Sequence, residues 1–476
     1  MTLGYEEAVG SLHAIDPAWP RPAVLDVLEA PENRHLLDFV QEDPFGAHVF
    51  PGNVPGTPAE FLRDLDAQLA SSGPIHLWSY IPTCAYRCRF CQYPVVLVKG
   101  KIEKAADWVD LNIAEARLWL DAVPNLAGAE VGEFNVFGGT PSLLPEAEIR
   151  RLLEFYRSHF GFTADTTIRF EGDPSTFTPA KLELLRELGC TKLSSGVQSF
   201  DDHVLELCGR EHTAKMCVDF VRNATAAGFE WVSIDLMYGL LDQTLDSVRR
   251  DLDVVLENEV TAVVCTKLHL ASYSDTRTGV TGEKPAAWQL PSYRDKLVRD
   301  GHRWPTLGEQ YQMRELLTEG LRAAGYTEHP TMYFARDGLG PEKWKSIMVD
   351  QDKQEAEVAI GLGGSSSCRA SEAITDVNSR RYPETVRSGR IPLGSATRFT
   401  PEAQEARAVK MALTTLQPLR DSRHTARFPG RSLFAEPWLG KFRSLASRGL
   451  VRLRPGVVEL TPAGEVLVEA IITTEL

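Results

Sequence analysis

The sequence of 476 residues has no run of about 18 apolar residues, so we expect no segment that spans a membrane. It opens with Met-Thr-Leu-Gly-Tyr-Glu-Glu, which lacks the basic and apolar layout of a secretory signal. Basic residues are outnumbered, 51 against 65 acidic ones, and the net charge of −14 argues against non-specific binding to a phosphate backbone. We therefore expect a cytoplasmic globular protein with neither a membrane nor a nucleic-acid partner.

Cysteine is also scarce, with 8 residues in the whole chain. Three of them, Cys84, Cys88 and Cys91, form a C-x3-C-x2-C motif directly after the apolar run 75–81. Three thiolates on one tight loop can bind three irons of a [4Fe–4S] cluster and leave the fourth iron open to a small ligand. A structural zinc site favours a fourth Cys or His, and none follows within ten residues of Cys91. Disulfides would need an oxidising compartment. The motif favours a cluster, with another metal as the alternative.

Short apolar runs alternate with helical patterns from residue 75 onward. Strands are expected at 75–81, 133–137, 167–171, 192–198, 231–238 and 261–270, each followed by one or two helices. Six such units predict right-handed crossovers and a parallel sheet, hence an α/β fold with a partial (β/α)6 barrel of the TIM type, open on one side. Chemistry in such barrels lies at the carboxyl ends of the strands, where the distinctive residues of this chain fall.

The remaining segments differ in composition. Residues 1–70 form a proline-rich extension with one or two helices between 25 and 40, and residues 45–50 either cross another domain or serve as a packing arm. The barrel is expected to occupy 71–330, with an irregular polar insertion at 271–308. Residues 331–400 are expected to link the units or cover the substrate. The order of elements in 401–476 is typical of a winged helix, in a packing or substrate-covering role rather than a DNA-binding one.

A family resemblance rests on several motifs: Phe137-Gly-Gly-Thr-Pro-Ser142, Glu171-Gly-Asp-Pro174, Ser195-Gly-Val-Gln-Ser-Phe200, Gly209-Arg210 and Ile234-Asp-Leu-Met-Tyr-Gly239. With the cysteine loop, they resemble the radical S-adenosylmethionine (SAM) superfamily and, in order and spacing, the oxygen-independent coproporphyrinogen III oxidase family. The resemblance is strong over 74–270 and weaker over 309–476. It implies a [4Fe–4S] cluster, one or two SAM molecules, a reductant such as flavodoxin or ferredoxin, and a 5′-deoxyadenosyl radical that abstracts hydrogen.

The resemblance also implies roles for single residues. Cys84, Cys88 and Cys91 would bind the cluster, and Gly138, Gly139 and Thr140 would lie beside the methionine part of SAM. Glu171 would take the amino group, Gln198 and Asp235 the ribose, and Arg210 the carboxylate. Phe90 would lie against adenine, and Trp78 belongs to the same cofactor-binding set. Backbone of the Gly361-Leu-Gly-Gly segment either pairs with adenine or forms a plain loop.

Four departures from the oxidase pattern bear on the reaction. Tyr93 stands where the oxidase has a fourth cysteine, Trp78 where it has a tyrosine, Tyr80 where it has a histidine, and Phe137 where it has a glycine. The missing fourth cysteine is similar to the class C radical SAM methyltransferases and cyclopropanases, a resemblance that implies two SAM molecules. We therefore predict transfer of a SAM-derived one-carbon unit to an sp2 carbon of a small molecule or peptide. Candidates for substrate-side proton or hydrogen transfer are Tyr80, Tyr93, Cys265, His269 and Tyr333.

Two alternatives stay open. One is a tetrapyrrole enzyme, either a coproporphyrinogen III decarboxylase or a haem-modifying methyltransferase. The other is a non-enzymatic haem chaperone, although the His-Asn-x-x-Tyr-Trp string of those relatives does not occur in this sequence.

Overall fold

A curved sheet of parallel strands forms the centre of the molecule. The computed structural model describes residues 3–9, 22–37, 53–71, 73–270, 284–336, 338–339 and 355–476. The six predicted strands are present and adjacent in chain order: β2 (Ile75–Ile81), β5 (Glu130–Gly138), β6 (Gly161–Gly172), β7 (Lys192–Gln198), β8 (Trp231–Tyr238) and β9 (Ala262–Lys267). Every neighbouring pair among them is parallel. The predicted partial barrel is thereby confirmed.

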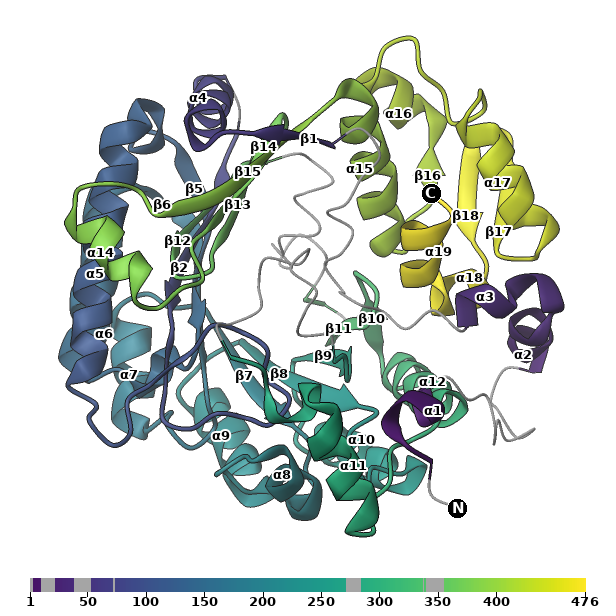
Figure 1. The fold of residues 1–476 in the computed structure, drawn as a ribbon, viewed down its shortest axis with the longest axis horizontal. Coiled ribbons are helices and arrows are strands. Elements are labelled where there is room, and N and C mark those ends of the chain that lie inside the picture. Colours follow the sequence, from purple (N-terminus) through teal and green to yellow (C-terminus); the bar gives the residue numbers. More distant parts are fainter. Residues whose placement is uncertain are drawn as a thin grey trace.

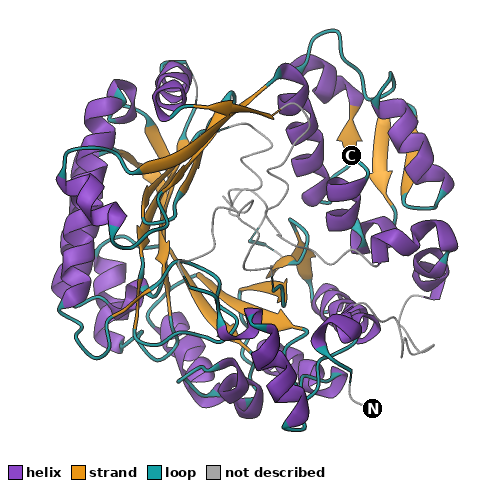
Figure 2. Cartoon of the chain, in the orientation of Figure 1, coloured by secondary structure: helices purple, strands orange, loops and turns teal. Residues whose placement is uncertain are grey.

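Helices cover the outer face of this sheet, and the strands line its inner side (Figures 1 and 2). They are α5 (Lys104–Ala122), α6 (Glu146–His159), α7 (Pro179–Glu187), α8 (Asp202–Cys208), α9 (Ala214–Ala226) and α10 (Leu245–Glu257). Four of them begin at a side-chain cap, at Thr178, Asp201, Thr213 and Thr244, which accepts hydrogen bonds from the first free N–H groups. Apolar side chains from neighbouring strands and the covering helices form one main core. Fully buried parallel strands explain the continuous apolar runs in the sequence.

Strands on both edges extend the sheet beyond the six expected. On one side β12 (Glu357–Gly361) pairs in parallel with β2, and β13 (Ser365–Ser367), β14 (Ser371–Thr375), β15 (Leu393–Phe399) and β1 (Asn53–Gly56) follow antiparallel. On the other side lie β11 (Tyr333–Arg336) and β10 (Tyr326–Glu328). Residues 331–400, expected to link or cover, thus supply strands to the main sheet.

The N-terminal extension is distributed over the fold. Helix α1 (Tyr5–Val9) lies against the 284–306 segment, where the rings of Tyr5 and Trp304 are 5.0 Å apart. Helices α2 (Pro22–Glu29) and α3 (Arg34–Leu37) pack into the C-terminal core, and α4 (Pro58–Leu69) packs on β14 and β15. The segment 45–50 lies outside the described residues.

The expected irregular insertion at 271–308 contains a helix in its described part. Helix α11 (Pro291–Arg299) begins with proline at its first position, where a missing N–H is tolerated. The 3-10 turn η6 (Ala287–Gln289) precedes it. The proline and the surrounding polarity suggested a loop, so this part of the expectation is wrong.

The C-terminal unit closes the open side of the barrel (Figure 1). It comprises α15 (Pro401–Thr414), α16 (Asp421–Arg427), α17 (Trp438–Ser447), α18 (Pro462–Val466) and α19 (Val468–Thr474) around a small sheet of β16 (Leu419–Arg420), β18 (Val457–Leu460) and β17 (Val451–Arg454). Helix α15 contacts β15 at one edge of the main sheet. At the other edge, Arg314 of α12 (Leu307–Ala323) donates a hydrogen bond to the Glu465 carbonyl at 3.1 Å. None of the described helices combines the length and apolarity that crossing a membrane requires.

Candidate active site

The cysteine loop leaves the carboxyl end of β2 and is anchored at both ends. Cys84 ends the short strand β3 (Thr83–Cys84), which pairs with β4 (Val96–Leu97). Cys84 and Cys88 are buried and Cys91 is half-buried. Burial raises the pKa of Cys84 to about 12 and that of Cys91 to about 11, so a cationic group is needed to hold them as thiolates.

The spacing of the three sulfurs distinguishes a cluster from a single ion. Among the described residues, the one trio of Cys, His, Asp or Glu whose ligand atoms all lie within 4.8 Å of one another contains no cysteine. A single zinc ion needs its ligands that close together, whereas the thiolates of a [4Fe–4S] cluster each bind a different iron. The cysteine geometry therefore favours the cluster over zinc.

Two glycines allow the end of β5 to approach the cysteine loop. A Cβ on Gly138, whose φ is +125°, would lie 2.6 Å from the Ile81 carbonyl oxygen. One on Gly139 would lie 2.8 Å from Cys84 Sγ. The Gly139 N–H donates to the Ile81 carbonyl at 2.8 Å, and Thr140 Oγ1 is 3.5 Å from Cys84 Sγ. These glycines were expected to let the backbone approach SAM. In the structure they also let β5 approach the loop that would bind the cluster.

We expect Gly139→Ala to retain much less iron than the wild type after anaerobic reconstitution. The added methyl group overlaps Cys84 Sγ and the Thr83 carbonyl, and such overpacking costs about 1–3 kcal/mol. Iron per chain and the absorbance of the cluster measure the effect. The control is Gly128→Ala, where an added Cβ meets no atom within 4 Å. Equal iron in both variants would contradict this role for Gly139.

Two half-buried carboxyl groups face each other across the strand ends. Burial and, to a lesser extent, the carboxylate of Asp235 in β8 together raise the pKa of Glu171, in β6, to about 8, against the pull of Arg169. Burial likewise raises the pKa of Asp235 to about 6, opposed by Arg169 and Arg210. A cationic ammonium group or ribose hydroxyls placed beside this pair would relieve its repulsion, as the predicted SAM contacts require.

Arg210 ties the cysteine loop to two neighbouring strands. Its Nη1 donates to Cys88 Sγ at 3.1 Å, and its Nη2 donates to the Gly196 carbonyl. Burial lowers the pKa of Arg210, but Cys88, Tyr86 and Asp173 raise it by more, so the guanidinium stays charged beside the cysteines. Its Nε is buried and lacks a hydrogen-bond partner among the described residues. That atom remains available for the carboxylate that sequence analysis assigned to Arg210, while the rest of the side chain serves the cysteine loop.

Asp173 was missed as a site residue, although it stands in the quoted Glu171-Gly-Asp-Pro174 motif. Its carboxylate accepts hydrogen bonds from Tyr86 Oη at 2.5 Å and His212 Nδ1 at 3.1 Å, and it forms an ion pair with Arg210 at 3.5 Å. These contacts hold the β6 exit, the cysteine loop and Arg210 in one network. Its position two residues after Glu171, in the same motif, could have indicated a role at the site. The sequence gives no indication of its contacts with His212 and Tyr86.

An aromatic wall lines the inner side near Glu171. The Trp78 and Tyr80 rings stack at 5.9 Å, Trp78 meets Phe137 edge-on at 5.0 Å, and the Arg169 guanidinium lies 4.4 Å from the Phe137 ring centre. Burial, followed by the charges of Glu357, Tyr93 and Glu171, raises the pKa of Tyr80, which places Tyr80 close to that carboxyl group. These rings form an aromatic surface beside Glu171.

The other predicted residues are spread more widely. Burial raises the pKa of Tyr333 to about 12 with a contribution from Asp235, so Tyr333 faces the site. Gln198 ends β7 with φ +71°, and Tyr93 is 50% exposed. The ring centres of Phe90 and Trp288 lie 6.2 Å apart. Cys265 packs in the main hydrophobic core, and His269 offers its carbonyl to the Gln92 amide at 2.6 Å.

The residues present fit a [4Fe–4S] cluster with SAM. The fit rests on three separated thiols, a glycine-lined approach, an unpaired buried guanidinium nitrogen and two carboxyl groups of raised pKa.

Comparisons with known proteins agree with this geometry. Residues 78–255 match the model of the radical SAM superfamily. The chain is 27% identical over 433 residues to an oxygen-independent coproporphyrinogen III oxidase of Pseudomonas aeruginosa, covering 87% of this chain and 88% of that protein. It is 23% identical to the heme chaperone HemW of Bacillus subtilis, covering 82% and 95%. The structure of coproporphyrinogen III oxidase (HemN) from Escherichia coli superposes with a TM-score of 0.71 at 24% identity, covering 86% and 92%, and confirms the fold.

Proposed function

We propose that this chain, whose residues 78–255 match the model of the radical SAM superfamily, abstracts a hydrogen atom from a tetrapyrrole. When bound, the [4Fe–4S] cluster and SAM supply a 5′-deoxyadenosyl radical, and an external reductant supplies the electron. The observation that carries the proposal is the similarity to a coproporphyrinogen oxidase along 87% of this chain, far beyond the 78–255 domain. The same similarity favours a tetrapyrrole over the small molecule or peptide expected from the four departures.

Each part of the site has a task in this proposal. Cys84, Cys88 and Cys91 hold the cluster. Glu171 and Asp235 hold the polar groups of SAM, while Arg210 neutralises the cysteine loop and offers Nε to a carboxylate. The wall of Trp78, Tyr80 and Phe137 keeps water away from the reacting carbon.

The direct test is anaerobic incubation of the cluster-loaded protein with SAM, a reductant and coproporphyrinogen III. Each converted propionate would give one hydrogen atom to the 5′-deoxyadenosyl radical, release CO2 and pass one electron to an added one-electron acceptor as a vinyl group forms. We expect 5′-deoxyadenosine together with a product that has lost CO2 and two hydrogens from one or two propionates, detected by mass spectrometry. SAM cleavage without any change in the tetrapyrrole would contradict the proposed substrate and leave the radical SAM assignment intact.

One-carbon transfer to an sp2 carbon is the second candidate. It is favoured by Tyr93, half exposed at the position of the family's fourth cysteine, and by Phe137 in the glycine motif. Methyl-deuterated SAM with coproporphyrinogen, haem and aromatic substrates tests it. Deuterium in a product supports transfer, and its absence from every product contradicts transfer to these substrates. A haem carrier, the remaining alternative, requires a Soret shift on titration with haem, and a flat titration contradicts it.

We expect the affinity for SAM to rise with pH up to about pH 8, by up to tenfold per unit, because Glu171 must lose a proton to receive a cationic amino group. Below its pKa of about 8 the carboxyl group is protonated, so acid competes with SAM. Equilibrium binding between about pH 6 and pH 9 measures the slope. In Glu171→Gln the affinity should be lower and the slope shallower. Glu183→Gln, on the exposed face of α7, should keep the wild-type profile, and identical slopes in all three proteins would contradict this role.

A further inference from the structure

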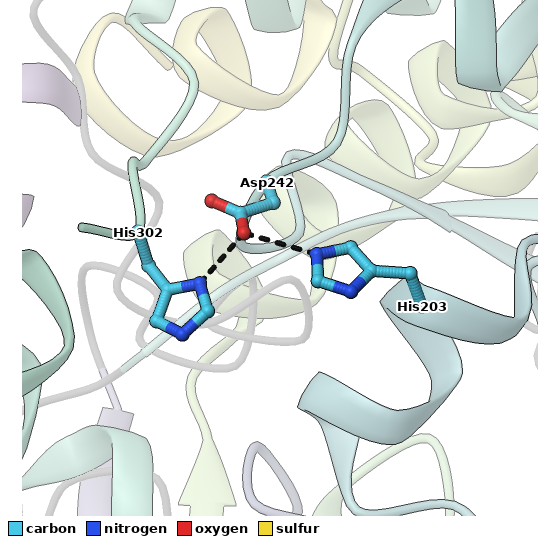
Figure 3. Close-up of side chains that lie close together, drawn as sticks. All are labelled: His203, Asp242 and His302. Atoms are coloured by element: carbon cyan, nitrogen blue, oxygen red, sulfur yellow. Dashed lines mark hydrogen bonds and ion pairs between the residues drawn. The ribbon is translucent and has the colours of Figure 1, made fainter. Parts of the chain in front are cut away.

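Three potential metal ligands converge outside the cysteine site. His203 lies in the first turn of α8, Asp242 follows β8, and His302 follows α11. Among the described residues they are the one set of three Cys, His, Asp or Glu side chains whose ligand atoms all lie within 4.8 Å of one another. Figure 3 shows both imidazole rings directed at the same carboxylate from different elements.

The donor atoms suit a divalent transition-metal ion. Asp242 Oδ2 lies 3.1 Å from His203 Nε2 and 2.7 Å from His302 Nδ1. Ligands of a tetrahedral zinc ion, with bonds of about 2.0–2.1 Å, are roughly 3.3 Å apart, so shifts of a few tenths of an ångström admit the ion. The His203 side chain is 58% exposed, which leaves an entry path and room for a water ligand.

The carboxylate is held in place by backbone that is itself constrained. The Arg303 N–H donates to Asp242 Oδ1 at 2.7 Å, and the Asp242 N–H donates to the Arg303 carbonyl at 2.9 Å. The nearby guanidinium of Arg303 is engaged by Glu309 through bonds of 3.0 and 2.8 Å. Oδ2 is therefore left to the two imidazoles.

The backbone that carries His203 is fixed independently of a metal. Asp201 caps α8, and its Oδ1 accepts a hydrogen bond from the His203 backbone N–H at 3.0 Å. The imidazole extends from this fixed backbone to Asp242 Oδ2.

We propose that His203, Asp242 and His302 bind one divalent transition-metal ion of the zinc class, with water completing a tetrahedral site. The ion would replace the protons that the two imidazoles share with Asp242. This inference does not rest on the proposed substrate or reaction.

The position of the site indicates what the ion would do. Two of its ligands lie near the two segments that hold Arg89, the residue between Cys88 and Phe90: His203 is on α8, and His302 is on the chain whose Trp304 packs edge-on against Trp288 at 5.1 Å. The Arg89 N–H donates to the Cys208 carbonyl of α8 at 2.8 Å, and the Arg89 carbonyl accepts from the Trp288 N–H at 2.9 Å. An ion that joins α8 to the chain after α11 would fasten both supports of the cysteine loop together.

The test uses cluster-loaded protein dialysed against micromolar free zinc, with zinc and iron per chain measured by mass spectrometry. We expect one zinc per chain in the wild type, and a loss of affinity of about 100-fold or more in His203→Ala and in Asp242→Asn. Zinc should raise the melting temperature of the wild type and leave that of His203→Ala unchanged. His203 is exposed, so its replacement leaves folding intact, and unchanged iron content verifies this in each variant.

The matched control is His35→Ala. His35 also meets a carboxylate, Glu475, at 2.6 Å on the surface, but as one imidazole with one carboxylate. It should keep wild-type zinc. Equal zinc in the wild type and His203→Ala would overturn the proposal, and so would zinc that is gained only as iron is lost, because that zinc would lie on the cysteines.

Discussion

Replacement of Cys91 by alanine is expected to abolish reductive SAM cleavage, by at least about a thousandfold, because the cofactor carries the chemistry that side chains cannot supply. With Cys84 and Cys88 alone, the loop offers two ligands to a cluster that requires three. The brown absorbance of the cluster and the yield of 5′-deoxyadenosine measure the loss.

The control for this experiment is Cys190→Ala. Cys190 is a buried thiol in the main core and is far from the motif in sequence. It should retain the cluster and its activity. A Cys91→Ala protein with wild-type iron and activity would show that the motif does not bind the cluster, and the zinc alternative would then return.

Asp173→Asn is expected to lower stability by about 3–5 kcal/mol at neutral pH, since it breaks a buried charged network. The wild-type carboxylate accepts from Tyr86, His212 and Ser175 and faces Arg210. Burial raises its pKa, but His212 and Arg210 lower it much further, to well below the usual range. Thermal unfolding followed by circular dichroism should give a melting temperature lower by roughly 5 °C or more.

The pH dependence of this difference follows from the sign of the shift. A depressed folded-state pKa contributes stability that is present above the unfolded pKa of about 3.9 and is lost as the pH falls toward the folded value. The gap between wild type and Asp173→Asn should therefore narrow below about pH 4. Asp253→Asn, on the exposed face of α10, should unfold like the wild type. Equal melting of the Asp173→Asn and wild-type proteins at neutral pH would contradict the network's role.

Several elements could be read directly from the residues. Strands β2, β7 and β8 have the predicted bounds 75–81, 192–198 and 231–238. Buried parallel strands select apolar residues on both faces, so their ends are marked where polarity returns. Strand β6 begins at Gly161, well before the predicted 167, because its first half is exposed and polar and carries no such signal.

The pairing of strands that are far apart in the sequence could not be predicted from the residues. The serine- and glycine-rich stretch around 361–367 gave no strand pattern, yet Gly361 pairs with Tyr80 beside the cysteine loop. A Cβ there would lie 2.3 Å from the Tyr80 carbonyl oxygen, which explains the glycine only after the partner is known.

The candidate site likewise has features that the sequence predicts and features that it does not. The sequence alone determined the cysteine motif, the six-strand order and the positions of Glu171 and Gln198 at the ends of β6 and β7, because each is local or follows from the period of parallel strands. Tertiary structure decided that Arg210 donates a hydrogen bond to Cys88 and that Asp173 contacts His212. It also decided that His203 and His302 both contact Oδ2 of Asp242. These contacts join loops whose approach depends on how helices and edge strands pack, and no pattern along the chain encodes those distances.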